Sequence, residues 1–240
     1  MSCRIALLAD IHGNAPALTA VLGHIDRLGA VDHVYSLGDM VSIGPDVNEV
    51  LAMLTSRPNV TMVRGNHEDY VTAVARGEAI DVSPGELEHQ QWIARRLSPE
   101  FLKVLAELPR ELVVEHAGRK LALSHYKVDP ATEWYAPTVL QPTVQALDAL
   151  YTDSEADVAC FGHYHPVHLF WSARRLYVNP GSLGCCYQPV ARYAVLDLAT
   201  DPVTVAFHAV PYERREFLAS YERLGVPDRD LILRAFHGVA

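Results

Sequence analysis

The sequence contains few cysteines and no long apolar segment. Its four cysteines, Cys3, Cys160, Cys185 and Cys186, form no CxxC pair and no spacing typical of a disulfide framework. This argues against a disulfide-stapled fold and indicates a reducing compartment. The apolar run at the start of the chain is too short for a signal peptide or a membrane span. We therefore expect a cytoplasmic protein with no membrane partner.

Positive charge is also scarce. The chain carries 20 lysines and arginines against 29 aspartates and glutamates, which is a formal net charge of −9 at pH 7. A dedicated binder of long nucleic acid usually presents a basic face, so this class of partner is not expected. The net charge does not exclude a local anion site, because bound metal ions reverse the field around them.

The first third of the chain alternates between strand and helix patterns. Strands are predicted at Arg4–Ala9, His33–Leu37 and Val60–Val63. Apolar residues recur with helical spacing from Ala17 to Leu28, with Asn14 as the predicted N-cap, and a second helix is predicted at Val47–Leu54. A β-α-β-α-β order predicts a parallel sheet with flanking helices.

The rest of the chain adds further strands and helices. Strands are predicted at Glu111–Glu115, Lys120–Ser124, Asp157–Phe161, Arg175–Val178, Arg192–Asp197 and Val203–Val210. Helices are predicted within 83–108 and 138–150, and in the tail at Glu213–Leu224 and Asp228–Phe236. Half of the 240 residues are hydrophobic, which suffices for a sizeable core. With no repeat or convincing linker, we expect a single domain over residues 1–240.

Potential metal ligands follow strand after strand. They are Asp10, His12, Asp39, Asn66, His67, His125, His163 and His165. The carboxyl ends of parallel strands lie along one edge of a sheet, so these segments are expected to meet in one crevice. In an extended segment, side chains two positions apart point the same way, which predicts that Asp10 and His12 reach one site together, as do His163 and His165.

The types of ligand indicate more than one metal ion. A mixed set of carboxylate, amide and imidazole groups without thiolates argues against a structural zinc site. The set is too large for one ion and suits two ions that share a carboxylate, about 3.5–4 Å apart. Two divalent ions, two aspartates and one hydroxide leave a net positive centre, which favours a phosphate substrate.

The motifs DxH, GD, GNH, H and GHxH, in this order, resemble those of the calcineurin-like metallophosphoesterases. They stand here as Asp10-Ile11-His12, Gly38-Asp39, Gly65-Asn66-His67-Glu68, His125 and Gly162-His163-Tyr164-His165. The segments GPDVNEVL, VNPGS and VPYERREFL look like those of the small bacterial branch of that family. The resemblance therefore extends over essentially the whole chain.

The resemblance implies an α/β fold: a four-layer α/β/β/α sandwich, with two packed mixed sheets flanked by helices. It also implies the distribution of the ligands. One ion would be held by Asp10, His12, Asp39 and His165. The second would be held by Asp39 as the bridge, Asn66, His125 and His163. Manganese is the expected ion, although iron, zinc, nickel and cobalt also accept these ligands.

The activity implied is the hydrolysis of phosphate mono- or diesters by a metal-bridging hydroxide. The resemblance assigns catalysis to His67, which would stabilise the phosphoryl group or protonate the leaving oxygen. The expected substrate is a small phosphorylated molecule such as a nucleotide, and a homodimer is also expected. The main alternative is a non-catalytic metal-binding scaffold of the same fold, because fold alone does not give function.

Several residues leave alternatives open. His67 could instead be a metal ligand or a passive loop residue, and Asn179-Pro180-Gly181-Ser182 reads equally as a turn or as an active-site loop. Glu68 and Asp69 are interpreted as solvated or supporting groups. Candidate substrate contacts are Asn14, Tyr126 and Arg192. Cys185 and Cys186 are interpreted as small buried hydrophobic residues.

Overall fold

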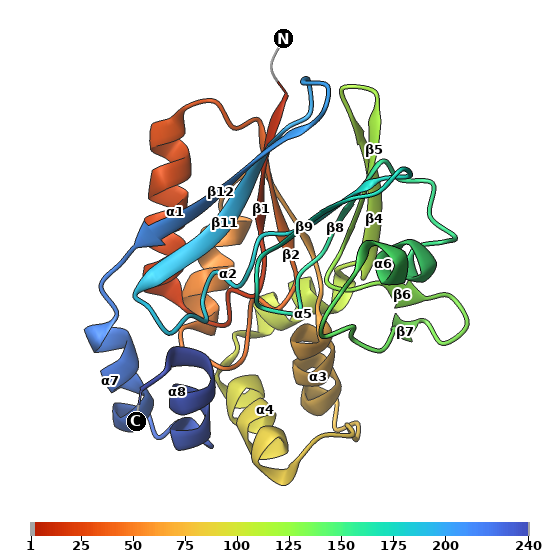
Figure 1. Cartoon of the computed structure of the whole chain (residues 1–240). Helices are drawn as coiled ribbons and strands as arrows, with labels where there is room; N and C mark the ends of the chain where they lie inside the picture. The colour runs from red at the N-terminus through yellow and green to blue at the C-terminus, as the bar shows by residue number, and fades with distance from the viewer. Residues whose placement is uncertain (1–2, 240) are drawn as a thin grey trace.

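The computed structural model describes residues 3–239 and contains two five-stranded mixed sheets (Figure 1). The first sheet has the order β12-β11-β1-β2-β3. Its strands are β1 (Arg4–Leu8), β2 (His33–Leu37), β3 (Val60–Val63), β11 (Val190–Asp197) and β12 (Thr204–Pro211). Strands β1, β2 and β3 are parallel, as the alternating pattern predicted, and β11 and β12 pair antiparallel beside them.

The second sheet has the order β4-β5-β8-β10-β9. Its strands are β4 (Glu111–His116), β5 (Arg119–Ser124), β8 (Val158–Cys160), β9 (His168–Trp171) and β10 (Leu176–Asn179). The central strands β5, β8 and β10 are parallel, and β4 and β9 pair antiparallel at the edges. A separate short ladder joins β6 (Val128–Asp129) to β7 (Trp134–Tyr135).

The two sheets pack face to face around a shared apolar layer. Leu7 and Leu37 of the first sheet meet Leu123 and Val178 of the second in one buried cluster. Leu8, next to Leu7, points to the opposite face of its sheet, because side chains alternate along a strand. The central strands are therefore buried on both faces, which explains why they appear in the sequence as continuous apolar runs.

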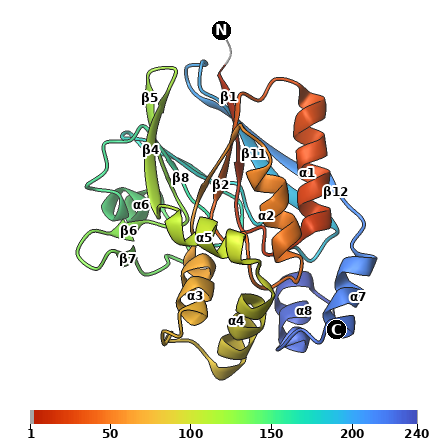
Figure 2. The same cartoon turned by 180° about the vertical axis from the view of Figure 1, so that it is seen from behind.

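Helices complete the outer layers. On the first sheet, α1 (Ala15–Leu28) and α2 (Val47–Thr55) bury one apolar face each (Figure 2). On the second sheet, α6 (Val144–Leu150) packs on Tyr151, Phe161 and Tyr177. The expected four-layer α/β/β/α sandwich is confirmed, although the second sheet is covered by a single short helix and loops.

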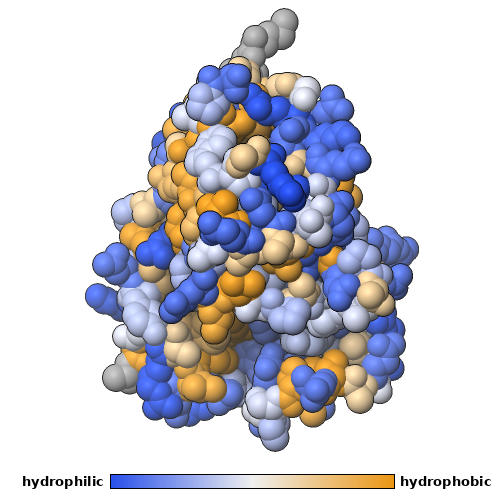
Figure 3. Space-filling model, turned by 45° about the vertical axis from the view of Figure 1, so that its right-hand side comes forward, coloured by the Kyte–Doolittle hydropathy of each residue, from blue (hydrophilic) through white to orange (hydrophobic). Residues whose placement is uncertain are grey.

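The remaining helices gather at one end of the sheets, below the carboxyl ends of β1–β3 (Figures 1 and 2). They are α3 (Asn66–Ala75), α4 (Pro84–Arg96), α5 (Pro99–Glu107), α7 (Arg215–Arg223) and α8 (Arg229–His237). Within residues 3–239, no helix is both long and apolar enough to cross a bilayer. The face shown in Figure 3 is largely hydrophilic with separate hydrophobic patches.

Several elements differ from the sequence-based prediction, and among them the strands β6, β7 and β9 were not predicted. The helix predicted within 138–150 begins only at Val144, because Pro137 and Pro142 cannot sit in a helix interior and Thr143 caps the first turn by accepting from the Ala146 N–H. Helix α3 was not predicted. Its buried residues include Glu68, Asp69 and Thr72, so it lacks the apolar periodicity by which helices are recognised.

Candidate metal centre

The loops that follow the strands carry the candidate ligands with an unusual backbone. Asp10, His12, Asp39 and His163 adopt left-handed conformations, with φ of 54°, 48°, 52° and 65°. The sequence predicted that Asp10 and His12 lie in an extended segment, as do His163 and His165, and this prediction is therefore wrong. Left-handed non-glycine residues are strained and cluster at functional sites. Sharp turns of the chain, rather than strand alternation, bring these side chains together.

Both sheets contribute to the site. Asp10 and His12 follow β1, Asp39 follows β2 and Asn66 begins α3 after β3, whereas the other ligands follow β5 and β8 of the second sheet. Gly65 allows the start of α3 to approach this closely, because a Cβ at this position would collide with the carboxylate of Asp39.

The first group of ligand atoms belongs to Asp10, His12 and His165. Their ligand atoms all lie within 4.8 Å of one another. The Nε2 atoms of His12 and His165 are 3.2 Å apart, and Asp10 Oδ1 lies 3.7 Å from His165 Nε2. Among residues 3–239, no hydrogen-bond partner reaches the buried Oδ2 of Asp10. A buried carboxylate oxygen needs a partner, and a cation would supply it.

The second group belongs to Asp39, His125 and His163. Asp39 Oδ2 lies 3.1 Å from His125 Nε2, and His125 Nε2 lies 3.2 Å from His163 Nδ1. Asn66 Oδ1 joins this group at 3.1 Å from His163 Nδ1. Asp39 Oδ2 is also 3.9 Å from His12 Nε2 in the first group, so this carboxylate lies between the two.

Burial controls the protonation of the histidines. It lowers the pKa of His12 well below the ordinary value and lowers the pKa values of His163 and His165 to about 4. These rings are therefore neutral near pH 7, with a nitrogen lone pair available to a metal. The close pairs of ring nitrogens can share a hydrogen bond, or they can turn their lone pairs toward a common cation, and imidazole together with carboxylate suits divalent metals.

The pKa values of Asp10, Asp39 and His125 depend on one another. Burial raises the pKa of Asp10 to about 7. Burial also acts to raise the pKa of Asp39, but His125, His67 and His12 outweigh it and hold that pKa well below its usual range. For His125, burial lowers the pKa but the charge of Asp39 raises it to about 9 overall. A metal ion at His125 would have to displace this proton.

His67 lies beside the centre and has a defined partner behind it. Its Nε2 is 4.0 Å from Asp39 Oδ2, so geometry also permits a ligand role together with His12 and Asp39. Its Nδ1 lies 2.8 Å from Nε2 of the buried Gln90, whose Oε1 accepts a hydrogen bond from Ser42. This series of hydrogen bonds makes Gln90 the donor to Nδ1, so the N–H of the ring is on Nε2.

Glu68 holds the loop that carries Asp39. It is fully buried, and its carboxylate accepts four backbone hydrogen bonds, from Gly65, Asp39, Met40 and Val41, at 2.6–3.1 Å. Of the two sequence interpretations of Glu68, burial excludes the solvated residue and the hydrogen bonds agree with the supporting one. Its position in the GNHE motif was the available signal, but three of its four partners lie 27–29 residues away.

The segment Asn179–Ser182 also serves the ligand loops. Asn179 donates to the carbonyls of Gly162 and Tyr164, and Ser182 donates to the carbonyl of Asp10. The amide of Ser182 is bonded to the carbonyl of His165. Several donors of this segment, which an active-site loop could offer to a substrate, are therefore already used to hold the loops that carry the candidate ligands.

The three candidate substrate contacts occupy different surroundings. Asn14 is fully buried: it caps α1 and donates to the Gly184 carbonyl and the Tyr212 hydroxyl, which leaves no side available to a substrate. Tyr126 is 2% exposed, and its hydroxyl accepts from the Val139 N–H. The structure brings neither to an open surface. Arg192 differs, because it lines a groove with His165.

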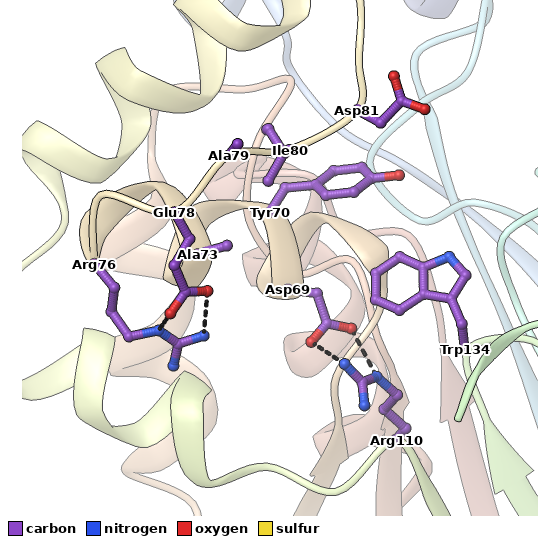
Figure 4. Close-up of a pocket in the computed structure, with 10 residues that line it drawn as sticks. All are labelled: Asp69, Tyr70, Ala73, Arg76, Glu78, Ala79, Ile80, Asp81, Arg110 and Trp134. Carbon is purple, nitrogen blue, oxygen red and sulfur yellow. Dashed lines mark hydrogen bonds and ion pairs between the residues drawn. The ribbon is translucent and has the colours of Figure 1, made fainter. Parts of the chain in front are cut away.

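Two cavities are lined by residues of the centre, and a third lies farther along α3. A groove of about 700 Å³ contains His165, Arg192 and the buried Cys185 and Cys186. A pocket of about 210 Å³ between α4 and α8 is lined by His67. A third, of about 440 Å³, lies beyond α3, and its arginines are paired with carboxylates, Arg110 with Asp69 and Arg76 with Glu78 (Figure 4).

Comparison with known proteins agrees with this geometry. The family model of the calcineurin-like phosphoesterase superfamily domain matches residues 3–201. The chain belongs to this superfamily of hydrolases. A solved metallophosphoesterase from Sphaerobacter thermophilus superposes with a TM-score of 0.76 over 98% of each chain, at 24% identity. A hypothetical protein from Pyrococcus horikoshii superposes with a TM-score of 0.83 over 99% of each chain, at 20% identity. At such identities these matches establish the fold of this phosphoesterase.

A curated relative of the phosphoesterase is a symmetrical bis(5'-nucleosyl)-tetraphosphatase from Pectobacterium atrosepticum. It is 27% identical over 150 residues, which are 62% of this chain and 51% of the relative. The chain spans about half the length of the curated relatives that it matches first.

Proposed function

We propose that this phosphoesterase hydrolyses phosphate esters at a centre of two divalent ions. The observation that carries the proposal is the pair of ligand groups, with Asp39 lying between them. Asp10, His12, Asp39 and His165 would hold one ion, and Asp39, Asn66, His125 and His163 the other. When bound, the ions would supply a hydroxide nucleophile at neutral pH and neutralise charge on the phosphoryl oxygens.

His67 would contribute a proton donor to the phosphoryl group. The Gln90 amide occupies its Nδ1, so Nε2 presents an N–H toward the centre. This N–H would donate to a phosphoryl oxygen or to the leaving oxygen. His67 is 16% exposed, so a substrate can reach it, whereas His12 and His125 are buried at the base of the site.

The proposed substrate is a small phosphoester, and a nucleotide in particular. The names of several curated relatives refer to dinucleoside tetraphosphates. Arg192 lines the groove beside His165 and offers a cation to further phosphate groups. Manganese as the resident ion, a homodimer and a cytoplasmic location remain predictions from the sequence.

The test combines metal analysis with a panel of substrates. Protein loaded with manganese or iron should hold two ions per chain and release 4-nitrophenol or phosphate from at least one class among aryl monoesters, aryl diesters and nucleotides. The variant His67→Ala should keep both ions and lose about 10²–10⁴-fold in turnover. As a matched control, His24→Ala on α1 should keep ordinary turnover.

Each result separates the proposal from its alternatives. A protein that holds two ions but hydrolyses no ester would be the non-catalytic scaffold. Binding of no more than one ion would refute the dinuclear centre. Loss of an ion in His67→Ala would make His67 a ligand, and full activity in this variant would remove it from catalysis.

A further inference from the structure

The pocket between α4 and α8 opens directly onto His67. Its volume is about 210 Å³, and Gln90 lies beside His67 in its wall. A protein cavity of roughly 150 Å³ accepts a benzene molecule. The pocket can therefore hold an aromatic ring beside His67, the residue that the proposed function assigns to the phosphoryl group.

The wall opposite His67 is apolar and comes from α8, which lies beyond the residues matched by the family model. Leu231, Ile232 and Phe236 contribute to it, together with Ile43 from the loop after β2. Ile232 packs with Ile43 in a buried cluster, whereas Leu231 is 52% exposed. An exposed leucine at the mouth of a pocket offers contact area to a ligand.

The charges around this pocket disfavour an anion. The described residues that line it include the carboxylates Glu86 and Asp228 and no lysine or arginine. The groove that contains Arg192 lies on the other side of Phe236, which lines both cavities. The Phe236 ring is centred 5.7 Å from that of His165 and 6.5 Å from that of His12, so it stands at the metal centre.

We propose that the pocket between α4 and α8 binds an uncharged, ring-bearing ester arm of the substrate. This inference rests on the proposed function and refines it. The phosphoryl group would lie at the metal centre, the neutral arm would enter the pocket beside His67, and an anionic arm would extend past Phe236 toward Arg192. The favoured class is then a phosphodiester or anhydride with one neutral aromatic arm.

The test uses phosphonates, which carry a single arm and are not hydrolysed. The manganese-loaded full chain is titrated calorimetrically with methylphosphonate, phenylphosphonate and 4-carboxyphenylphosphonate. Phenylphosphonate should bind with a Kd about tenfold lower than either of the others, because only its ring is both apolar and uncharged. Since no turnover is needed, hydrolysis of the ester panel tests the proposed function separately.

Variants of Leu231 locate the arm. Leu231→Asp adds a third carboxylate at the mouth and should abolish the advantage of the phenyl ring, while the Kd of methylphosphonate changes less than about twofold. Leu231→Met should retain wild-type values. The matched control is Leu169→Asp, a leucine on β9 that is 40% exposed and is not in this pocket.

Two results would overturn the inference. One is equal or tighter binding of methylphosphonate or 4-carboxyphenylphosphonate by the wild-type chain. The other is a phenyl advantage that survives in Leu231→Asp. If the ester panel is hydrolysed while either result is found, the proposed function stands and only the position of the arm is wrong.

Discussion

Replacing Glu68 by glutamine tests whether this side chain holds the Asp39 loop. Each carboxylate oxygen accepts two backbone N–H groups: Oε2 accepts from Gly65 and Asp39, and Oε1 from Met40 and Val41. In glutamine one oxygen becomes an amide donor. Whichever way the amide turns, two buried N–H groups lose their acceptor and face another donor.

The expected loss follows from these two groups. A buried donor without a partner costs about 1–3 kcal/mol, so Glu68→Gln should lower the free energy of unfolding by about 2–6 kcal/mol. Burial raises the pKa of Glu68 to about 7, and removal of this unfavourable buried charge offsets part of the loss. The remainder is large beside a typical stability of about 5–15 kcal/mol.

Urea unfolding followed by circular dichroism measures the loss, and metal analysis of the folded variant measures its effect on the site. We expect Glu68→Gln to bind metal more weakly, because the loop that carries Asp39 is no longer fixed. Glu88→Gln on the exposed side of α4 is the control and should change stability by less than about 0.5 kcal/mol. A loss below about 1 kcal/mol with unchanged metal content would refute this reasoning.

Three further predictions concern the site and its support. Asp39→Asn should lower both the metal affinity and the turnover by more than about a hundredfold, which is more than replacement of a supporting residue typically costs. Metal analysis that still finds two ions would contradict the bridging role. Gln90→Ala should lower kcat about tenfold in the wild type and not at all in His67→Ala, because it acts through that ring; additive losses would refute this. Burial lowers the pKa of His89 to about 4 in the folded chain. As the pH falls, His89 is therefore protonated at a higher pH in the unfolded chain than in the folded chain. The stability due to neutral His89 should be complete above about pH 6.5 and lost as the pH falls toward 4. Thermal unfolding should therefore show a weaker pH dependence in His89→Gln; an unchanged profile would exclude His89 as its source.

The sequence was most informative about local structure and about which residues are candidate ligands. The first helix follows from its apolar spacing and from the Asn14 cap, both of which depend on residues a few positions apart. The parallel core strands follow from their apolar runs. The motifs around Asp10, Asp39 and His163 indicated metal chemistry, because few other functions need this combination of side chains after successive strands.

These patterns could not predict contacts between segments that are far apart in the sequence. Gln90 meets His67 across 23 positions, and Glu68 meets the loop after β2 across 27–29 positions, without any periodic signal. The same limit applies to α3, whose buried face is polar. Asn14 was proposed as a substrate contact, but the packing of Gly184 and Tyr212 against it could be seen only in the folded chain.

The sequence by itself determined which side chains are available for metal and phosphate chemistry, and on which strands they arrive. Only the tertiary structure decided how they are used. Left-handed turns at Asp10, His12, Asp39 and His163 orient the candidate ligands, and loops from both sheets place Asp39 between two groups. Helix α8, far along the chain, sets Phe236 beside His12 and His165. These arrangements depend on long-range packing, which stabilises backbone conformations that local preferences disfavour.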